Sequence, residues 1–142
     1  MSKAEVVMAE IWLDGGVLIE ERWEDIEDPE TGLTRQETRY AIPGGEVEPN
    51  ETEAEATVRE VEEETGIILS PEDPIFAKPE LIQERPNKVV LFKKLLRGQV
   101  QLKDGILVCT VPEILVFGDS GKLMPYSEIY VNREYRDGAI DN

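Results

Sequence analysis

The stretch PGGEVEPNETEAEATVREVEEETGI, residues 43–67, carries the strongest chemical signal in the chain. Between Gly45 and Ile67 it contains nine glutamates and a single arginine, Arg59. Like charges four residues apart on a helix repel one another by about 0.2–0.5 kcal/mol per pair. Such a concentration of carboxylates indicates either a solvated acidic helix face or a binding site for a cation.

Local rules predict a helix from Glu53 to Glu64 within this stretch. Thr52 is suited to the N-cap position, and Glu55 three residues later completes a capping box with it. Gly66 stands where a left-handed C-terminal cap is expected. The helical period gives one stripe that can pack on a sheet, formed by Ala54, Val58, Val61 and Thr65.

Three carboxylates fall on a different face of the predicted helix, since Glu60, Glu63 and Glu64 lie within about 100° of one another. Gly44 and Gly45 precede the helix and have no side chain, so a backbone carbonyl there can approach a ligand closely. Clustered carboxylates beside a carbonyl oxygen suit a hard divalent cation such as Mg²⁺ or Mn²⁺. Charge spacing alone leaves this site and the solvated face as open alternatives.

The spacing of the specified residues resembles a complete Nudix box. Its signature positions are filled by Gly45, Glu51, Arg59, Glu60, Val61, Glu63, Glu64, Gly66 and Ile67. Such a set at fixed spacing is far more specific than a short glycine motif. The resemblance implies a divalent-metal-dependent enzyme that hydrolyses a diphosphate linkage in a nucleoside diphosphate joined to another group.

The resemblance also implies roles for particular residues. The family's metal-binding positions are matched by Glu60, Glu63 and Glu64, and Gly44 is the candidate for a backbone carbonyl ligand. Arg59 and Glu51 match positions that orient the metal-binding glutamates, which completes the predicted catalytic set. Arg59 can also pair with Glu55 or Glu63 at helical spacing. The general base is left open between a box glutamate and a later one, for which Glu84 and Glu113 are candidates.

Residues outside the box must select the substrate, which the resemblance implies is a small-molecule nucleotide. Candidate base-stacking residues are Trp12, Trp23, Tyr40 and Phe92, although packing is the commoner role for each. Arg22, Arg35 and Arg39 could contact phosphate or sugar. The downstream labels of ADP-ribose and dinucleoside polyphosphate hydrolases are absent, so a (d)NTP-type nucleotide is the default. Alternatives are ADP-ribose or another nucleotide-sugar, a non-catalytic module that senses a nucleotide, and a cation-binding protein without enzymatic activity.

Composition excludes several other functions. The 142 residues carry a formal net charge of −16, which argues against binding duplex nucleic acid through its phosphates. Histidine is absent, which removes Ser-His-Asp triads and histidine acid–base catalysis. No apolar run approaches the ~20 residues that span a membrane, and the single cysteine, Cys109, fits a reducing compartment. We therefore expect a cytoplasmic protein that binds no membrane, with extended hairpins that leave room for a homodimer.

Hydrophobic patterns outside the box predict the rest of the fold. Strands are expected at residues 4–13, 17–21, 34–42 and 88–97, and a further hairpin at 100–103 and 106–111. Residues 67–69 are expected to begin a strand, the acidic segment 23–32 to form an exposed loop, and residues 126–136 to form a helix. Strands interrupted by one helix and closed by another fit an α/β/α sandwich with a mixed β-sheet, formed by one domain over residues 1–142.

Overall fold

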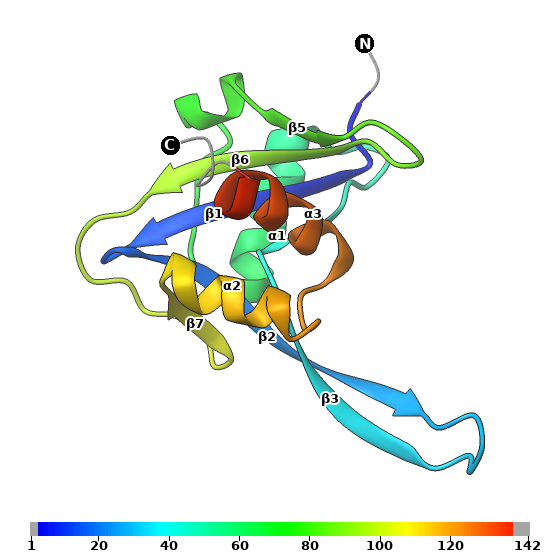
Figure 1. Cartoon of the computed structure of the whole chain (residues 1–142). Helices are drawn as coiled ribbons and strands as arrows, with labels where there is room; N and C mark the ends of the chain where they lie inside the picture. Colours follow the sequence, from blue (N-terminus) through cyan, green and yellow to red (C-terminus); the bar gives the residue numbers. More distant parts are fainter. Residues whose placement is uncertain (1–2, 138–142) are drawn as a thin grey trace.

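The computed structural model describes residues 3–137, which build a seven-stranded sheet with helices on both faces (Figure 1). Helix α1 (Glu53–Thr65) covers one face, and α2 (Val111–Asp119) and α3 (Pro125–Val131) cover the other. The strands are β1 (Val6–Leu13), β2 (Gly16–Glu27), β3 (Thr34–Ala41), β4 (Gly44–Glu46), β5 (Glu80–Gln83), β6 (Val89–Leu95) and β7 (Ile106–Cys109). The predicted α/β/α sandwich is confirmed.

The sheet is mixed because β1 runs parallel to β6, while the other pairs are antiparallel. The strand order is β3-β2-β1-β6-β5, and β4 pairs with β1 while β7 pairs with β2. Strand β1 therefore lies at the centre, with hydrogen-bonded neighbours on both sides. Among residues 3–137, no helix is long and apolar enough to cross a membrane.

Alternation along β1 explains how its two faces are filled. Ala9 and Ile11 pack in the cluster that contains Val61 of α1, whereas Met8 packs in the cluster that contains Ile114 of α2. Successive side chains of a strand point to opposite faces. A run that is almost wholly apolar therefore buries both sides, as the sequence of a central strand predicts.

The caps of α1 follow the local rules. Thr52 accepts a hydrogen bond from the Glu55 N–H, the reciprocal half of the capping box is present, and Gly66 ends the helix with φ 86°. The buried face differs in part from the predicted stripe, because it consists of Ala56, Thr57, Val61 and Thr65. Ala56 packs in the cluster of Val7 and Phe92, which turns the helix so that Ala54 and Val58 are only half-buried.

The segment 23–32 is only partly the predicted loop. Strand β2 continues to Glu27, which pairs with Thr34, so β2 and β3 form a long projecting arm (Figure 1). Salt bridges link Arg39 to Glu24 at 3.4 Å and to Glu37 at 2.9 Å. The acidic run looks loop-like by itself, but basic residues on β3 supply cross-strand partners.

Two further expectations are wrong and one is confirmed. Residues 67–69 and 100–103 form no strand. The expected hairpin of residues 100–103 with 106–111 is absent because β7 pairs with β2. Helix α2 was not predicted, although Thr110 and Glu113 form a capping box at its start. The C-terminal helix is present as α3 and continues as a π-helical turn, η2 (Asn132–Asp137). A 3₁₀ turn, η1 (Pro74–Ala77), precedes β5.

Candidate active site

Gly44 and Gly45, called the Gly44–Gly45 bend below, begin strand β4. They place β4 between β1 and the acidic face of α1. A Cβ atom at Gly44 would overlap the Val7 carbonyl oxygen and lie 2.9 Å from Met8 Cα. A Cβ atom at Gly45 would lie 2.5 Å from Cδ of Glu60. Both glycines are therefore needed for close approach, the first to backbone and the second to a carboxylate.

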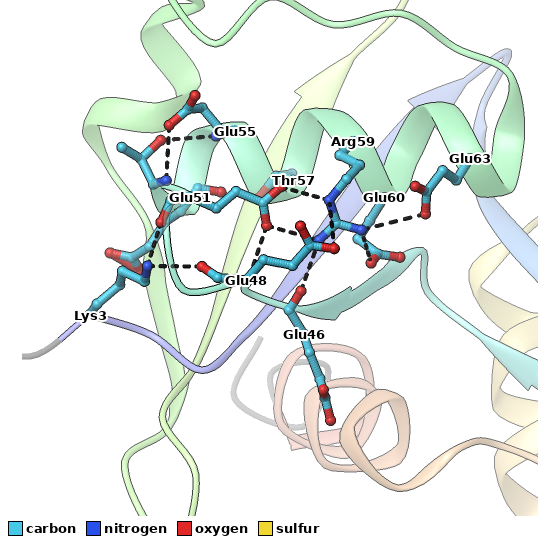
Figure 2. A network of polar contacts seen from close by, with 11 residues as sticks. Lys3, Glu46, Glu48, Glu51, Glu55, Thr57, Arg59, Glu60 and Glu63 are labelled. Atoms are coloured by element: carbon cyan, nitrogen blue, oxygen red, sulfur yellow. Dashed lines mark hydrogen bonds and ion pairs between the residues drawn. The ribbon is translucent and has the colours of Figure 1, made fainter.

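Arg59 holds the loop before α1 and two carboxylates of α1 together (Figure 2). Its Nε and Nη2 donate to both Glu51 oxygens, at 2.6 and 2.8 Å. Its Nη1 donates to Glu60 Oε1 at 2.7 Å and reaches Glu63 Oε2 at 3.4 Å. Nη2 also donates to the Glu46 carbonyl at 3.0 Å. The predicted orienting role fits this geometry, and of the two predicted partners only Glu63 contacts Arg59.

The Glu51–Arg59 pair is a strong charge-assisted interaction. Hydrogen bonds from Arg59 lower the pKa of Glu51 to about 2, and the same bonds raise the pKa of the Arg59 guanidinium. A bidentate arginine–carboxylate pair fixes geometry as well as charge. On the other side of the loop, Lys3 Nζ donates to the carbonyl oxygens of Glu48 at 3.1 Å and Glu51 at 2.5 Å (Figure 2).

Glu64 faces the opposite side of the bend from Arg59. Its Oε2 accepts the Gly44 N–H at 3.0 Å, and its Oε1 accepts from Arg22 Nη2 at 3.3 Å. Burial, reinforced by the nearby Glu20 carboxylate, raises the pKa of Glu64 well above its ordinary value. Arg22 Nε also donates to Glu20 Oε1 at 2.6 Å. Two carboxylates and one arginine therefore share a half-buried space.

Glu20 was not among the predicted site residues. It lies two positions from Leu18, and alternation along β2 places both on the face covered by α1. Its Oε2 is buried and has no hydrogen-bond partner among residues 3–137. The strand period could have placed Glu20 beside Arg22, but only the packing of β2 under α1 brings it to Glu64.

The three box glutamates are not equally placed. The side chains of Glu60 and Glu64 are 15% and 13% exposed, whereas that of Glu63 is 59% exposed. Within residues 3–137, no group of three or more acidic or thiol side chains is arranged to hold a metal ion. Each box glutamate has a protein partner, and the convergence of all three on a cation stays a prediction.

The chemistry of the site nevertheless fits a hard divalent cation. The donors around the bend are carboxylate oxygens, and Glu20 contributes an orphan oxygen to the same space. The room that a Cβ atom at Gly45 would fill lies against the carboxylate of Glu60. Oxygen donors of this kind suit Mg²⁺ or Mn²⁺ better than softer metals.

A cavity of about 420 Å³ opens beside the bend. Its lining includes Arg22, Gly44, Gly45, Met8, Asn87 and Tyr126. Pockets of roughly 300–1,000 Å³ hold small molecules in proteins. The cavity is thus contiguous with the box and large enough for part of a nucleotide.

None of the four predicted stacking residues lines this cavity. The indole of Trp12 donates to Glu10, and Trp23 is 63% exposed on the arm. Tyr40 stacks on Phe117 with ring centroids 3.8 Å apart, and Phe92 is buried in the core. Sequence reasoning missed Met8, Asn87 and Tyr126 because three distant segments supply them.

Neither candidate for a general base outside the box stands out in the structure. Glu113 caps α2, since its carboxylate accepts the Thr110 N–H at 2.9 Å. Glu84 is exposed in the turn between β5 and β6 and does not line the cavity. Arg35 and Arg39 are engaged with Glu37 on the arm. Of the basic residues singled out from the sequence, Arg22 is the one that lines the cavity.

The two adjacent glycines should respond differently to the same substitution. We expect Gly44→Ala to lower the melting temperature, because the new methyl group meets the backbone of β1, which cannot yield. We expect Gly45→Ala to lower the melting temperature less than Gly44→Ala does and to weaken metal binding and turnover, because the flexible Glu60 carboxylate swings aside and loses its contact with Arg59. Thermal unfolding and Mn²⁺ titration followed by electron paramagnetic resonance check both. Equal melting temperatures for the two variants would contradict the assignment.

Comparison with known proteins places this geometry in a family. The NUDIX domain model matches residues 2–126. The fold is similar to that of the ORF135 protein of E. coli, with a TM-score of 0.58, 22% identity and coverage of 100% of this chain and 94% of that chain. It is similar to the MutT protein from Methanosarcina mazei, with a TM-score of 0.55, 23% identity and coverage of 97% and 98%. No curated protein matches the sequence.

A third similar structure is a bifunctional NMN adenylyltransferase/ADP ribose pyrophosphatase from Francisella tularensis, complexed with AMP and a Mn ion. The TM-score is 0.58 at 17% identity, and the match covers 96% of this chain but 42% of that chain. Nudix hydrolases generally use divalent metals and act on small-molecule nucleotides. The chain belongs to the NUDIX domain family, as its complete box predicted.

Proposed function

We propose that this protein hydrolyses the phosphoanhydride linkage of a nucleoside diphosphate joined to another group, with a (d)NTP-type nucleotide as the default substrate and Mg²⁺ or Mn²⁺ as the cofactor. The observation that carries the proposal is the position of the Gly44–Gly45 bend. It lies between Glu60 and Glu64 and also lines the adjoining cavity.

Within this proposal, Glu60, Glu63 and Glu64 hold the cation, with the Gly44 carbonyl as a backbone ligand. A bound divalent cation neutralises the diphosphate and acidifies the attacking water. Arg59 orients Glu60, because one Arg59 nitrogen contacts Glu60 while two others grip Glu51. Arg59 thus holds Glu60 and Glu51 in place, and cation binding brings Glu63 and Glu64 to Glu60.

Arg22 is the residue that we expect to contact a phosphate. It lines the cavity beside the bend. Its Nε donates to Glu20 at 2.6 Å, whereas its Nη2 makes the longer contact of 3.3 Å with Glu64. A guanidinium binds phosphate through paired N–H donors. With a formal net charge of −16 on the chain, a local arginine and the cation together offset the repulsion of a polyphosphate.

The test is a panel of nucleoside triphosphates, ADP-ribose and other nucleotide-sugars, assayed with Mg²⁺, with Mn²⁺ and with chelator. We expect metal-dependent release of a nucleoside monophosphate from at least one compound, and no release with chelator. Turnover of the nucleotide-sugars alone would replace the default substrate by the alternative. Nucleotide binding without any turnover would favour the non-catalytic sensing module.

The proposal also includes the domain organisation, the location and the oligomeric state of the protein. Residues 1–142 act as one domain in the cytoplasm, and the projecting β2–β3 arm is the element that we expect a second copy to contact in a homodimer. Sedimentation analysis at several concentrations tests the homodimer. A single species with the mass of one chain at every concentration would contradict it.

A further inference from the structure

The cavity beside the bend is also lined by a pair of polar side chains that have no role in the proposed hydrolysis. Asn87, just before β6, donates from Nδ2 to the Tyr126 hydroxyl oxygen at 3.0 Å. The Gln83 side-chain amide donates to the backbone carbonyl oxygen of Asn87 at 3.1 Å, and this hydrogen bond closes the β5–β6 turn. Both Asn87 and Tyr126 line the cavity that also reaches Arg22 and Gly44. The pair therefore faces any ligand whose phosphates lie at the bend.

Asn87 and Tyr126 have hydrogen-bond donors and an acceptor that are available to a ligand. The Tyr126 oxygen accepts from Asn87, so its own hydrogen is left to donate. The Asn87 amide retains a second N–H and its carbonyl oxygen. Among residues 3–137, these groups make no other hydrogen bond to the protein. The pair thus presents two donors followed by one acceptor.

A matching ligand edge has two acceptors followed by one donor. Guanine has this order along N7, O6 and N1–H, and cytosine has it along O2, N3 and N4–H. The corresponding edges of adenine and uracil place a donor between two acceptors. An adenine or uracil ring would therefore leave at least one polar group of the pair without a partner, which is costly in a desolvated pocket.

The walls of the cavity suit an aromatic ring. Met8, Ile42 and Met124 line it and are buried or half-buried. Thioether side chains pack well against aromatic faces and adapt to their outline. An apolar slot with a few placed polar groups is the usual form of a small-molecule site.

We propose that Asn87 and Tyr126 are specificity-determining residues that select a guanine or cytosine base over adenine and uracil. The inference rests on the proposed function for the placement of the phosphates, and it adds the class of base. Asn87 contacts the base directly, and Tyr126 both orients the Asn87 amide and donates to the base.

The experiment compares wild type with Asn87→Leu, which keeps the size of the side chain and removes its polar atoms, and with Tyr126→Phe. Gln99→Leu, at an exposed position outside this cavity, is the matched control. Values of kcat/KM are measured for GTP, CTP, ATP and UTP with Mg²⁺. Dissociation constants for the four nucleoside monophosphates are measured by calorimetry without metal, and thermal unfolding confirms that each variant is folded.

We expect wild type and Gln99→Leu to prefer GTP or CTP over ATP and UTP by about 10- to 100-fold, because only guanine and cytosine give every polar group of the pair a partner. Tyr126→Phe should reduce that ratio to about 3-fold or less, because the remaining Asn87 N–H and carbonyl oxygen pair with two adjacent edge atoms of any of the four bases. Asn87→Leu should also reduce it to about 3-fold or less, because a single hydroxyl donor finds an acceptor on every base. The comparison of GTP with CTP identifies which of the two bases is bound.

Other outcomes separate the inference from the function that underlies it. Hydrolysis of all four nucleotides at similar rates, or an unchanged ratio in Asn87→Leu, would overturn the inference and leave the proposed function standing. Monophosphate binding with the expected preference but no hydrolysis would support the inference and contradict the proposed function. Preference for an adenine compound, ADP-ribose included, would overturn the inference.

Discussion

Replacing Glu63 by glutamine is expected to lower kcat/KM about 10³-fold, equivalent to roughly 4 kcal/mol of transition-state stabilisation. We expect the melting temperature to stay within about 2 °C of wild type, because substitutions of exposed side chains usually change stability by less than about 0.5 kcal/mol. The Glu63 side chain is 59% exposed and lies 3.4 Å from Nη1 of Arg59. The measurement is steady-state hydrolysis of the best substrate, with thermal unfolding alongside.

Glu63 is the most informative of the three box glutamates to change. Glu60 and Glu64 are half-buried beside the bend and contact Arg59, Arg22 and the Gly44 backbone, so their loss would alter the local structure as well as metal binding. Glu62→Gln is the matched control, because Glu62 is exposed on the same helix and lies outside the box signature. Equal Mg²⁺-dependent activity in the two variants would refute the metal assignment of Glu63.

The second large effect is expected far from the phosphates, at a buried carboxylate in β1. Glu10 is 2% exposed and accepts hydrogen bonds from Trp12 Nε1 at 2.5 Å, from Tyr135 at 2.9 Å and from Tyr130. Burial, together with the Glu10 carboxylate, raises the pKa of both tyrosines. This carboxylate joins the central strand to α3 and η2.

We expect Glu10→Ala to lower the free energy of unfolding by about 3–5 kcal/mol, because two buried tyrosine hydroxyls and the half-buried Trp12 N–H lose their acceptor and a cavity is left. The melting temperature should fall by roughly 10 °C or more. Chemical denaturation monitored by tryptophan fluorescence and circular dichroism measures the change.

Two further variants test whether the loss of stability comes from the hydrogen bonds to Glu10. Glu10→Gln keeps the shape and one acceptor, so it should cost less than Glu10→Ala. Glu128→Ala, at an exposed position of α3, should change the free energy of unfolding by less than about 0.5 kcal/mol. A loss below about 1 kcal/mol in Glu10→Ala would show that the three hydrogen bonds contribute little net stability.

Local rules recover the parts of the fold that depend on local chemistry. The capping box at Thr52, the left-handed Gly66 and the apolar central strand follow from short-range preferences. The strand that ends at Glu27 was missed because its stability depends on arginines more distant in the chain. Helix α2 was missed although its cap carries the same signature as that of α1, since its apolar residues also suit a strand.

The candidate site was likewise predicted only in part from the sequence. The box predicts which carboxylates bind the cation, and the structure shows that Arg59 pairs with Glu51. The cavity was not foreseen, because β1, the β5–β6 turn and the start of α3 must all be in place before it exists. Residues such as Asn87 carry no local pattern that separates them from ordinary turn residues.

The start of the chain is held against the proposed site at two points. Gly44 lies against the backbone of Val7, and the Lys3 ammonium group donates to the carbonyl oxygens of the loop before α1. These contacts limit where the chain can be cut or permuted. The first strand packs against the proposed active site, so we expect hydrolysis to require this strand and α1 together. A circular permutant that moves the chain ends elsewhere must keep the segment from Lys3 to Val7 docked. Fragments split between this segment and the helix should regain hydrolysis only when they reassociate, which makes the protein a suitable reporter for complementation.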